Sequence, residues 1–203
     1  MTYSINRLEA FSDGVIAIII TLLVFNLPLP TPDEGDLVQN LLIRAEEFAA
    51  FFVSFFVIGV MWINHHDLFR VIHKADHILF LLNVFLLLGI TIVPFTTRLM
   101  ATYIRTDQNQ VSAVIYAGGY FMTAFFFNIL WRYASYKRRL VGSEISDNDV
   151  KIITRNYNIG FMLYFVGFLL SFISAQLTLL INLGLAIFFA LPTRENAITR
   201  IDS

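Results

Sequence analysis

The sequence predicts an all-α integral membrane protein with six transmembrane helices per subunit, forming one domain over residues 1–203. Hydrophobic residues make up 57% of the chain, against about 45–50% in soluble domains. Charged residues make up only 14%, roughly half the usual share. The apolar residues fall into long stretches separated by polar connections, so we expect lipid rather than water around most of the chain.

Each apolar stretch approaches the roughly 20 residues that a helix needs to cross a bilayer. The expected spans are residues 11–29, 48–63, 78–95, 111–131, 157–173 and 176–191. The prolines that begin at Pro28 cannot continue the first helix, and Pro94 lies near the end of the third. The last two spans come from one block of apolar sequence, which is too long for one crossing and divides most naturally near Ser174.

The basic residues predict the orientation. If both termini are cytoplasmic, eleven of the 14 lysines and arginines lie on the cytoplasmic side and three lie outside, as the positive-inside rule requires. We therefore expect a multi-pass protein of a membrane, the prokaryotic plasma membrane in particular, because a single six-helix unit without a duplicated half is typical of prokaryotes. Residues 132–156 are expected to form a basic loop that turns at Gly142 and rests on anionic lipid headgroups.

Several classes of function find no support in the sequence. The absence of cysteine excludes disulfides, thiolate metal sites and a cysteine nucleophile. The formal net charge of -1 gives no reason to expect a nucleic-acid partner. Gly-x-Ser-x-Gly, His-Glu-x-x-His and phosphate-loop motifs are missing, so we expect neither an enzyme nor a bound cofactor.

The first predicted helix has two different sides. At 100° per residue, Ile18, Leu22 and Phe25 fall within about 60° of one another, and Thr21 lies about 60° to one side of Ile18. Asp13 lies roughly 140° from Ile18, close to the membrane boundary. An apolar stripe of this kind is most often a packing face, and the wheel alone leaves that interpretation open.

The second predicted helix ends with side chains suited to hold Asp13. A charge near the hydrocarbon needs polar partners, and we expect the histidines there, with Arg7, Ser12 and Asn64, to meet it as a structural clasp. An alternative is a metal site built from His65, His66, His73 and His77. That alternative is less favoured because no carboxylate completes a known ligand pattern.

Two motifs together are specific. Arg7-x-x-x-Phe11-Ser12-Asp13 is followed by Ala17-Ile18 and Thr21-Leu22-Leu23, and Trp62-x-x-His65-His66 closes the second helix. The whole chain thereby resembles the bacterial relatives of the lysosomal potassium channel called transmembrane protein 175. The resemblance implies a homotetramer in which the first helix of each subunit lines a central pore.

The resemblance also implies roles for individual residues. Ile18, Leu22 and Phe25 would form the pore constriction, although Phe25 stands where the family is expected to carry an aliphatic residue. Thr21 would contribute to cation selectivity. A structural network behind the pore would comprise Arg7, Phe11, Ser12, Asp13, Trp62, Asn64 and His65.

The expected function is a potassium-preferring channel for monovalent cations with a hydrophobic constriction and no carbonyl-cage filter. Its partners would be the permeant potassium ion, the lipid bilayer and further copies of the chain, with no metal site. One alternative is an ion-coupled or proton-conducting transporter, although the expected midplane carboxylate is missing. Another is a non-transporting scaffold, in which the Ile18 stripe packs against a neighbouring protein.

Overall fold

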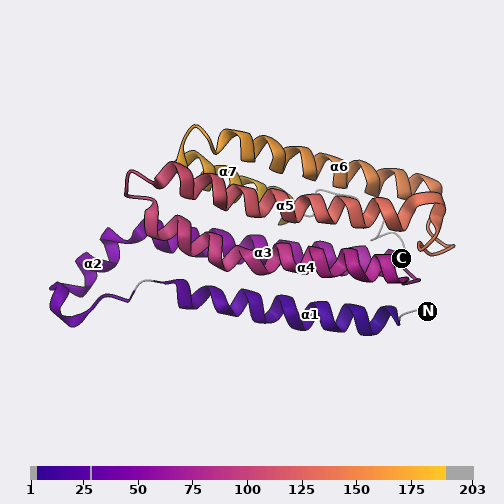
Figure 1. The fold of residues 1–203 in the computed structure, drawn as a ribbon, viewed down its shortest axis with the longest axis horizontal. Helices are drawn as coiled ribbons and strands as arrows, with labels where there is room; N and C mark the ends of the chain where they lie inside the picture. The colour runs from indigo at the N-terminus through magenta and orange to yellow at the C-terminus, as the bar shows by residue number, and fades with distance from the viewer. Residues whose placement is uncertain (1–3, 28, 191–203) are drawn as a thin grey trace.

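Six long helices lie side by side in one bundle in the computed structural model of this chain, which describes residues 4–27 and 29–190 (Figure 1). They are α1 (Ile5–Leu22), α3 (Ala45–Val71), α4 (His77–Tyr103), α5 (Asn109–Ser135), α6 (Asp147–Leu170) and α7 (Ala175–Ala190). Short helical segments connect some of them: η1 (Leu23–Asn26), η2 (Pro32–Glu34), α2 (Leu37–Ile43) and η3 (Tyr136–Arg138). Successive long helices run in opposite directions, so α7 runs back toward the end at which α1 begins.

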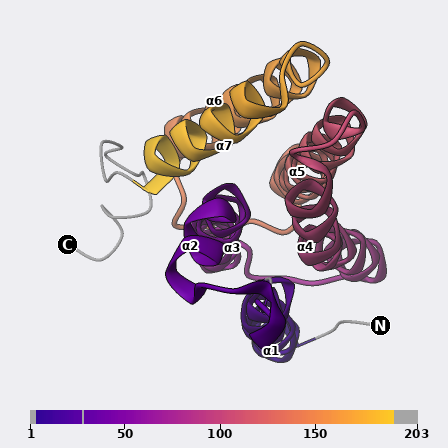
Figure 2. The same ribbon diagram turned by 90° about the vertical axis from the view of Figure 1, so that its left-hand side faces the viewer.

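The first helix lies at one margin of the bundle and the last two lie at the opposite margin (Figure 2). α1 packs against α3 and α4. α4 packs along α5, while α6 and α7 cover α5, with α7 also touching α3. The buried core therefore runs through α3, α4 and α5, and α1 is covered on one side only.

Four helical segments are long and apolar enough to cross a membrane: α1 with η1, α3, α4, and α5 with η3. Over residues 4–27 and 29–190 the protein is therefore helical, with four candidate spans. α7 is apolar but shorter. α6 is continuous, but its first half is polar and was not included in the expected span at 157–173.

The helices extend past several of the expected boundaries. α3 continues to Val71, two turns beyond the expected end at residue 63. α4 continues through Pro94 to Tyr103, since a proline removes only one backbone donor from the helix. The Pro94 carbonyl also accepts a 2.8 Å hydrogen bond from Asn26 Nδ2. The first helical segment instead stops early, at Asn26, because Leu27 is extended, as a residue before proline prefers.

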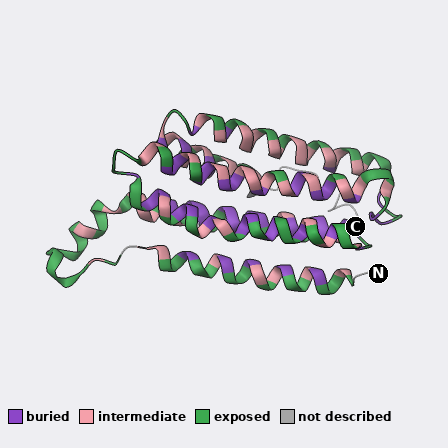
Figure 3. Cartoon of the chain, in the orientation of Figure 1, coloured by how far each residue is buried: buried purple, intermediate pink, exposed green. Residues whose placement is uncertain are grey.

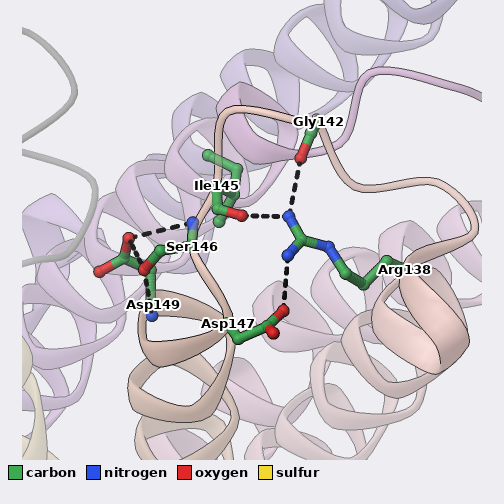
Figure 4. Close-up of polar contacts among 6 residues, drawn as sticks. All are labelled: Arg138, Gly142, Ile145, Ser146, Asp147 and Asp149. Atoms are coloured by element: carbon green, nitrogen blue, oxygen red, sulfur yellow. Dashed lines mark hydrogen bonds and ion pairs between the residues drawn. The ribbon is translucent and has the colours of Figure 1, made fainter.

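The expectation of a loop over residues 132–156 was wrong for its last ten residues. α5 runs to Ser135, and α6 already begins at Asp147. A capping box starts α6, because Ser146 Oγ accepts from the Asp149 N–H at 3.1 Å and Asp149 Oδ2 accepts from the Ser146 N–H at 3.3 Å (Figure 4). These polar residues therefore form the first turns of a helix.

The α3–α4 connection and the α5–α6 connection lie at the same end of the bundle and contact each other. An isolated β-bridge pairs Ile72 with Val141, next to a 2.9 Å hydrogen bond from the His73 N–H to the Leu140 carbonyl. The bridge ties the α3–α4 connection to the α5–α6 connection. At the other end, the acidic connection after α1 contains the short helix α2, whose N-cap Asp36 accepts a hydrogen bond from the Gln39 N–H.

Candidate functional site

One face of α1 is packed inside the subunit and the opposite face is open. The packed face carries Leu8, Ser12, Ile16, Ile19 and, in η1, Leu23, all buried against the rest of the bundle. Ile18 is 62% exposed, Leu22 44% and Phe25 77%. In Figure 3 the outer side of α1 is correspondingly mostly exposed. The stripe that the sequence identified is therefore not a packing face within the described subunit.

Two side chains of α3 hold the polar edge of α1 near its start. Trp62 Nε1–H donates to Asp13 Oδ1 at 3.0 Å. One turn later, His66 Nδ1 lies 3.1 Å from Glu9 Oε1. The Trp62 and His66 rings stack, with centroids 6.1 Å apart. Because both acids face α3, these contacts determine how α1 is rotated about its axis.

A second connection is fully buried and links three helices. Asn83 Nδ2 on α4 donates to Ser12 Oγ at 2.8 Å, and the Ser12 hydroxyl donates to the Leu8 carbonyl at 2.9 Å. His65 Nε2 lies 3.0 Å from Asn83 Oδ1, which can only accept, so His65 carries its proton on Nε2. The His65 ring also stacks on Phe69, with centroids 4.4 Å apart. The chain Ser12–Asn83–His65 thus fixes α1 against both α3 and α4.

Asn83 is a site residue that the sequence analysis did not assign. The sequence does contain a signal for it, since an asparagine within an apolar helix must find a partner inside the protein. The sequence could not identify that partner, because Ser12 is 71 residues away.

Three of the residues expected behind the pore lie outside these contacts. Phe11 is 54% exposed and lies seven residues before Ile18, which places it on the open face of α1 instead. Asn64 Nδ2 donates to the Val60 carbonyl of its own helix. Arg7 is exposed at the start of α1. Of the residues expected behind the pore, four take part in these contacts within the described subunit: Ser12, Asp13, Trp62 and His65. Three residues that were not expected there also take part: Glu9, His66 and Asn83.

The histidines considered for a metal site have separate partners. His65 contacts Asn83, His66 contacts Glu9, and His73 Nε2 lies 3.1 Å from Glu144 Oε1. Over residues 4–27 and 29–190, no group of three or more His, Cys, Asp or Glu side chains is arranged to hold a metal ion.

Thr21 is an exposed polar residue that directly precedes Leu22 and follows Ile18 by three residues in α1. Its hydroxyl donates to the Ile18 carbonyl at 2.7 Å. The hydroxyl proton is therefore directed at the backbone, and the oxygen lone pairs remain available on an exposed side chain. Such an oxygen can accept from water or contact a cation. The face thus combines large apolar side chains with one acceptor.

The comparisons with known proteins identify one family. The family model for the endosomal/lysosomal potassium channel TMEM175 matches residues 7–94. A potassium channel of Chamaesiphon minutus is 43% identical over 194 residues, covering 94% of this chain and 95% of its own length. The crystal structure of a lysosomal potassium-selective channel TMEM175 homologue from Chamaesiphon minutus matches with a TM-score of 0.84 and 42% identity, covering 92% of this chain and 96% of that chain.

A vertebrate relative matches over a shorter region. The endosomal/lysosomal proton channel TMEM175 of Gallus gallus is 35% identical over 117 residues, which are 53% of this chain and 23% of the relative. The bacterial and vertebrate relatives are thus named for different ions.

Proposed function

This chain belongs to the TMEM175 family, and on that premise we propose that it is a potassium channel whose pore is lined by α1. Four copies of the subunit would surround the pore, each directing the open face of α1 toward the central axis. The observation that carries this proposal is the contrast between the two faces of α1. Ile18 is 62% exposed, whereas the neighbouring Ile19 is 3% exposed.

The pore would be narrowest where large apolar side chains meet. In this arrangement Ile18 forms a ring of four side chains, with Leu22 and Phe25 forming rings farther along. Such a constriction gates by dewetting, and an ion crosses it only after losing part of its hydration shell. Potassium sheds water more cheaply than sodium, so we expect a modest preference for potassium. The Thr21 oxygens would stabilise the partly dehydrated ion.

The buried contacts behind α1 would keep the pore face in register. If α1 rotated by one residue, Ile19 would replace Ile18 at the axis, and Asp13 would lose Trp62. The Trp62–Asp13 and Ser12–Asn83–His65 contacts oppose that rotation. We therefore assign them a structural role, with no direct contact to the ion.

The end of the bundle where α1 begins would face the cytoplasm of a prokaryotic cell. That end carries the basic α3–α4 and α5–α6 connections, as the positive-inside rule requires. Both chain termini would then lie in the cytoplasm, with α6 and α7 completing six crossings. The protein would need no cofactor other than the permeant ion.

Proton conduction is a second candidate, favoured by the name of the Gallus gallus relative. A pore whose constriction is transiently wetted passes protons along the water chain without a protein carboxylate. The two candidates differ in which gradient drives the flux, so one set of vesicles can separate them.

The deciding experiment is ion flux from liposomes that contain the purified protein, with potassium inside and sodium outside. We expect a potassium-driven flux, measured as the dissipation of the gradient. Proton conduction is tested in vesicles that hold equal potassium on both sides, a pH gradient and a pH-sensitive dye inside. Absence of any flux from folded, correctly inserted protein would contradict the channel and favour a scaffold.

The variant Ile18→Asn tests the pore assignment, with Ile19→Asn as its matched control. Ile18→Asn adds a polar group to the open face, so the protein should fold while its flux increases and its ion preference weakens. A barrier lower by only about 1.4 kcal/mol would raise the flux about tenfold. Ile19→Asn places the same amide in the packed face and should instead destabilise the protein, because the buried amide lacks a partner. Wild-type flux and ion preference in folded Ile18→Asn would remove Ile18 from the pore.

A further inference from the structure

Three cationic side chains gather where the end of α5 meets the first half of α6. Lys151, Arg155 and Asn158 lie within about 60° of one another around α6. Arg132 of α5 is held at this face, because its Nη2 donates to Asn158 Oδ1 at 2.9 Å and its Nε donates to Asn128 Oδ1 at 2.8 Å. Arg132, Lys151 and Arg155, here called the basic cluster, are all exposed.

The basic cluster differs from the other arginines at this end of the bundle because its charges are not neutralised. Arg138 pairs with Asp147 Oδ1 at 2.6 Å (Figure 4), and Arg139 pairs with Asp76. Within the described part of the chain, no member of the basic cluster forms an ion pair. Asp147 lies one turn before Lys151 but is engaged by Arg138, so the face keeps its positive charge.

An apolar stripe continues from the basic cluster along the same face of α6. It consists of Ile159, Met162, Val166 and Leu169, which are 38–54% exposed. These residues lie within about 80° of one another around the helix. A headgroup-binding end therefore leads directly into a surface suited to a hydrocarbon chain.

The position of α6 in the subunit places this face toward lipid. α6 lies at the margin of the bundle opposite α1 (Figure 2). This step rests on the proposed function, because α6 is outermost only if α1 faces the pore axis. In that arrangement the basic cluster lies at the cytoplasmic boundary of the bilayer and the stripe faces the acyl chains.

We propose that this face of α6 binds one anionic phospholipid per subunit. The phosphate of the headgroup would contact Lys151 and Arg155 and accept hydrogen bonds from Arg132, whose guanidinium is already oriented by the two asparagines. Arginine is suited to this role because its planar fork matches phosphate oxygens. One acyl chain would lie along the apolar stripe. The charge of the cluster selects an anionic lipid over a zwitterionic one.

Native mass spectrometry of the full-length protein tests this inference without measuring ion flux. Detergent-purified, delipidated protein is titrated with dioleoylphosphatidylglycerol, and the lipids bound per subunit are counted. We compare wild type, Lys151→Gln/Arg155→Gln, and the control Lys74→Gln/Lys137→Gln. The control removes two exposed charges from connections at the same end of the bundle.

The expected result is one tightly bound lipid per subunit in wild type and in the control. The cluster variant loses two basic residues that would meet the headgroup, so it should bind the lipid at least about tenfold more weakly. Equal weakening in both variants would show a diffuse charge effect and overturn the site, as would unchanged binding in the cluster variant. Displacement of the lipid by millimolar inorganic phosphate would overturn the role of the apolar stripe.

The outcomes separate this inference from the proposed function. Potassium flux with no specific lipid binding would leave the channel intact and remove the lipid site. Specific lipid binding with no flux would contradict the channel instead. Elution of both variants as the wild-type oligomer establishes that they are folded.

Discussion

Trp62 Nε1 on α3 and Asp13 Oδ1 on α1 lie 3.0 Å apart, so the side of α1 that carries Asp13 is attached to α3, while Ile18 lies about 140° away around the helix. An acid so close to apolar sequence is tolerated because it has a donor. The same contact prevents α1 from turning. This hydrogen bond therefore fixes the rotation of α1 and, with it, which of its residues face away from α3.

The first prediction concerns this contact. Asp13→Ala leaves the indole donor of Trp62 without its partner, and Trp62→Phe removes the donor while keeping an aromatic ring. Because Trp62 is 44% exposed, each variant should lower the free energy of unfolding by only about 0.5–1.5 kcal/mol. Because both variants remove the same hydrogen bond, the loss of stability in the double variant should be about 1 kcal/mol smaller than the sum of the two single losses. Thermal unfolding in detergent and oligomer yield measure this.

Asp13→Ala should also damage assembly more than ion preference. Protein that folds should keep the wild-type preference for potassium over sodium in liposomes. Normal oligomer yield with an altered ion preference would instead place Asp13 in contact with the pathway.

A second prediction concerns Asn83. Asn83→Leu leaves Ser12 and His65 without their shared partner between helices, so we expect a loss of about 1–3 kcal/mol of stability. Asn182→Leu is the matched control, since Asn182 is also buried but donates only to the Thr178 carbonyl of its own helix. Denaturation in detergent should rank Asn83→Leu as the more damaging. Equal losses would mean that the link between helices adds nothing beyond a local hydrogen bond.

Close packing of α4 against α5 gives a third prediction. A Cβ at Gly89 would lie 3.0 Å from Thr123 Oγ1 and 3.4 Å from Thr123 Cα. Gly89→Ala should therefore cost about 1–3 kcal/mol, since Thr123, whose hydroxyl donates to the Gly119 carbonyl, must shift to make room. Gly59→Ala in α3 meets no atom within 4 Å and should be neutral or stabilising. The midpoints of thermal unfolding of the two variants test this contrast.

A fourth prediction is a pH dependence at Asp76, in the α3–α4 connection. Desolvation raises the pKa of Asp76, but hydrogen bonds from the Leu79 N–H, the Tyr133 hydroxyl and the Arg139 guanidinium outweigh it, so the pKa is lowered from 3.8. A lowered pKa means that the folded state favours the charged form. The stabilisation is therefore present above the unfolded value of 3.8 and is lost as the pH falls through the folded pKa.

Asp76→Asn is the variant that isolates this effect, because it keeps an acceptor for the Leu79 N–H. The wild type should unfold at a higher temperature than the variant near neutral pH, and the difference should shrink as the pH falls below about 4. A difference that stays constant with pH would mean that the Asp76 charge does not stabilise the fold.

The presence of the helices could be predicted from local sequence, whereas several of their boundaries could not. All six expected spans fall largely within helices, because apolar stretches of this length identify helices without reference to the rest of the fold. The start of α6 was missed because Ser146 and Asp149 form a capping box within a segment whose polarity indicates a loop. Similarly, α3 and α4 continue past the apolar residues that defined their expected ends.

In the candidate site, too, some features could be predicted from local sequence and others depended on long-range packing. Ile18 and Asp13 fall on different sides of one helix by the 3.6-residue repeat alone, so their relationship was predictable. Whether the Ile18 side is packed or open was not, because that depends on where α3 and α4 lie. The Asp13–Trp62 and Ser12–Asn83 contacts join residues 49 and 71 positions apart, which no local pattern reports. Local periodicity therefore defined the two faces of α1, and only long-range packing decided which of them remains free to line a pore.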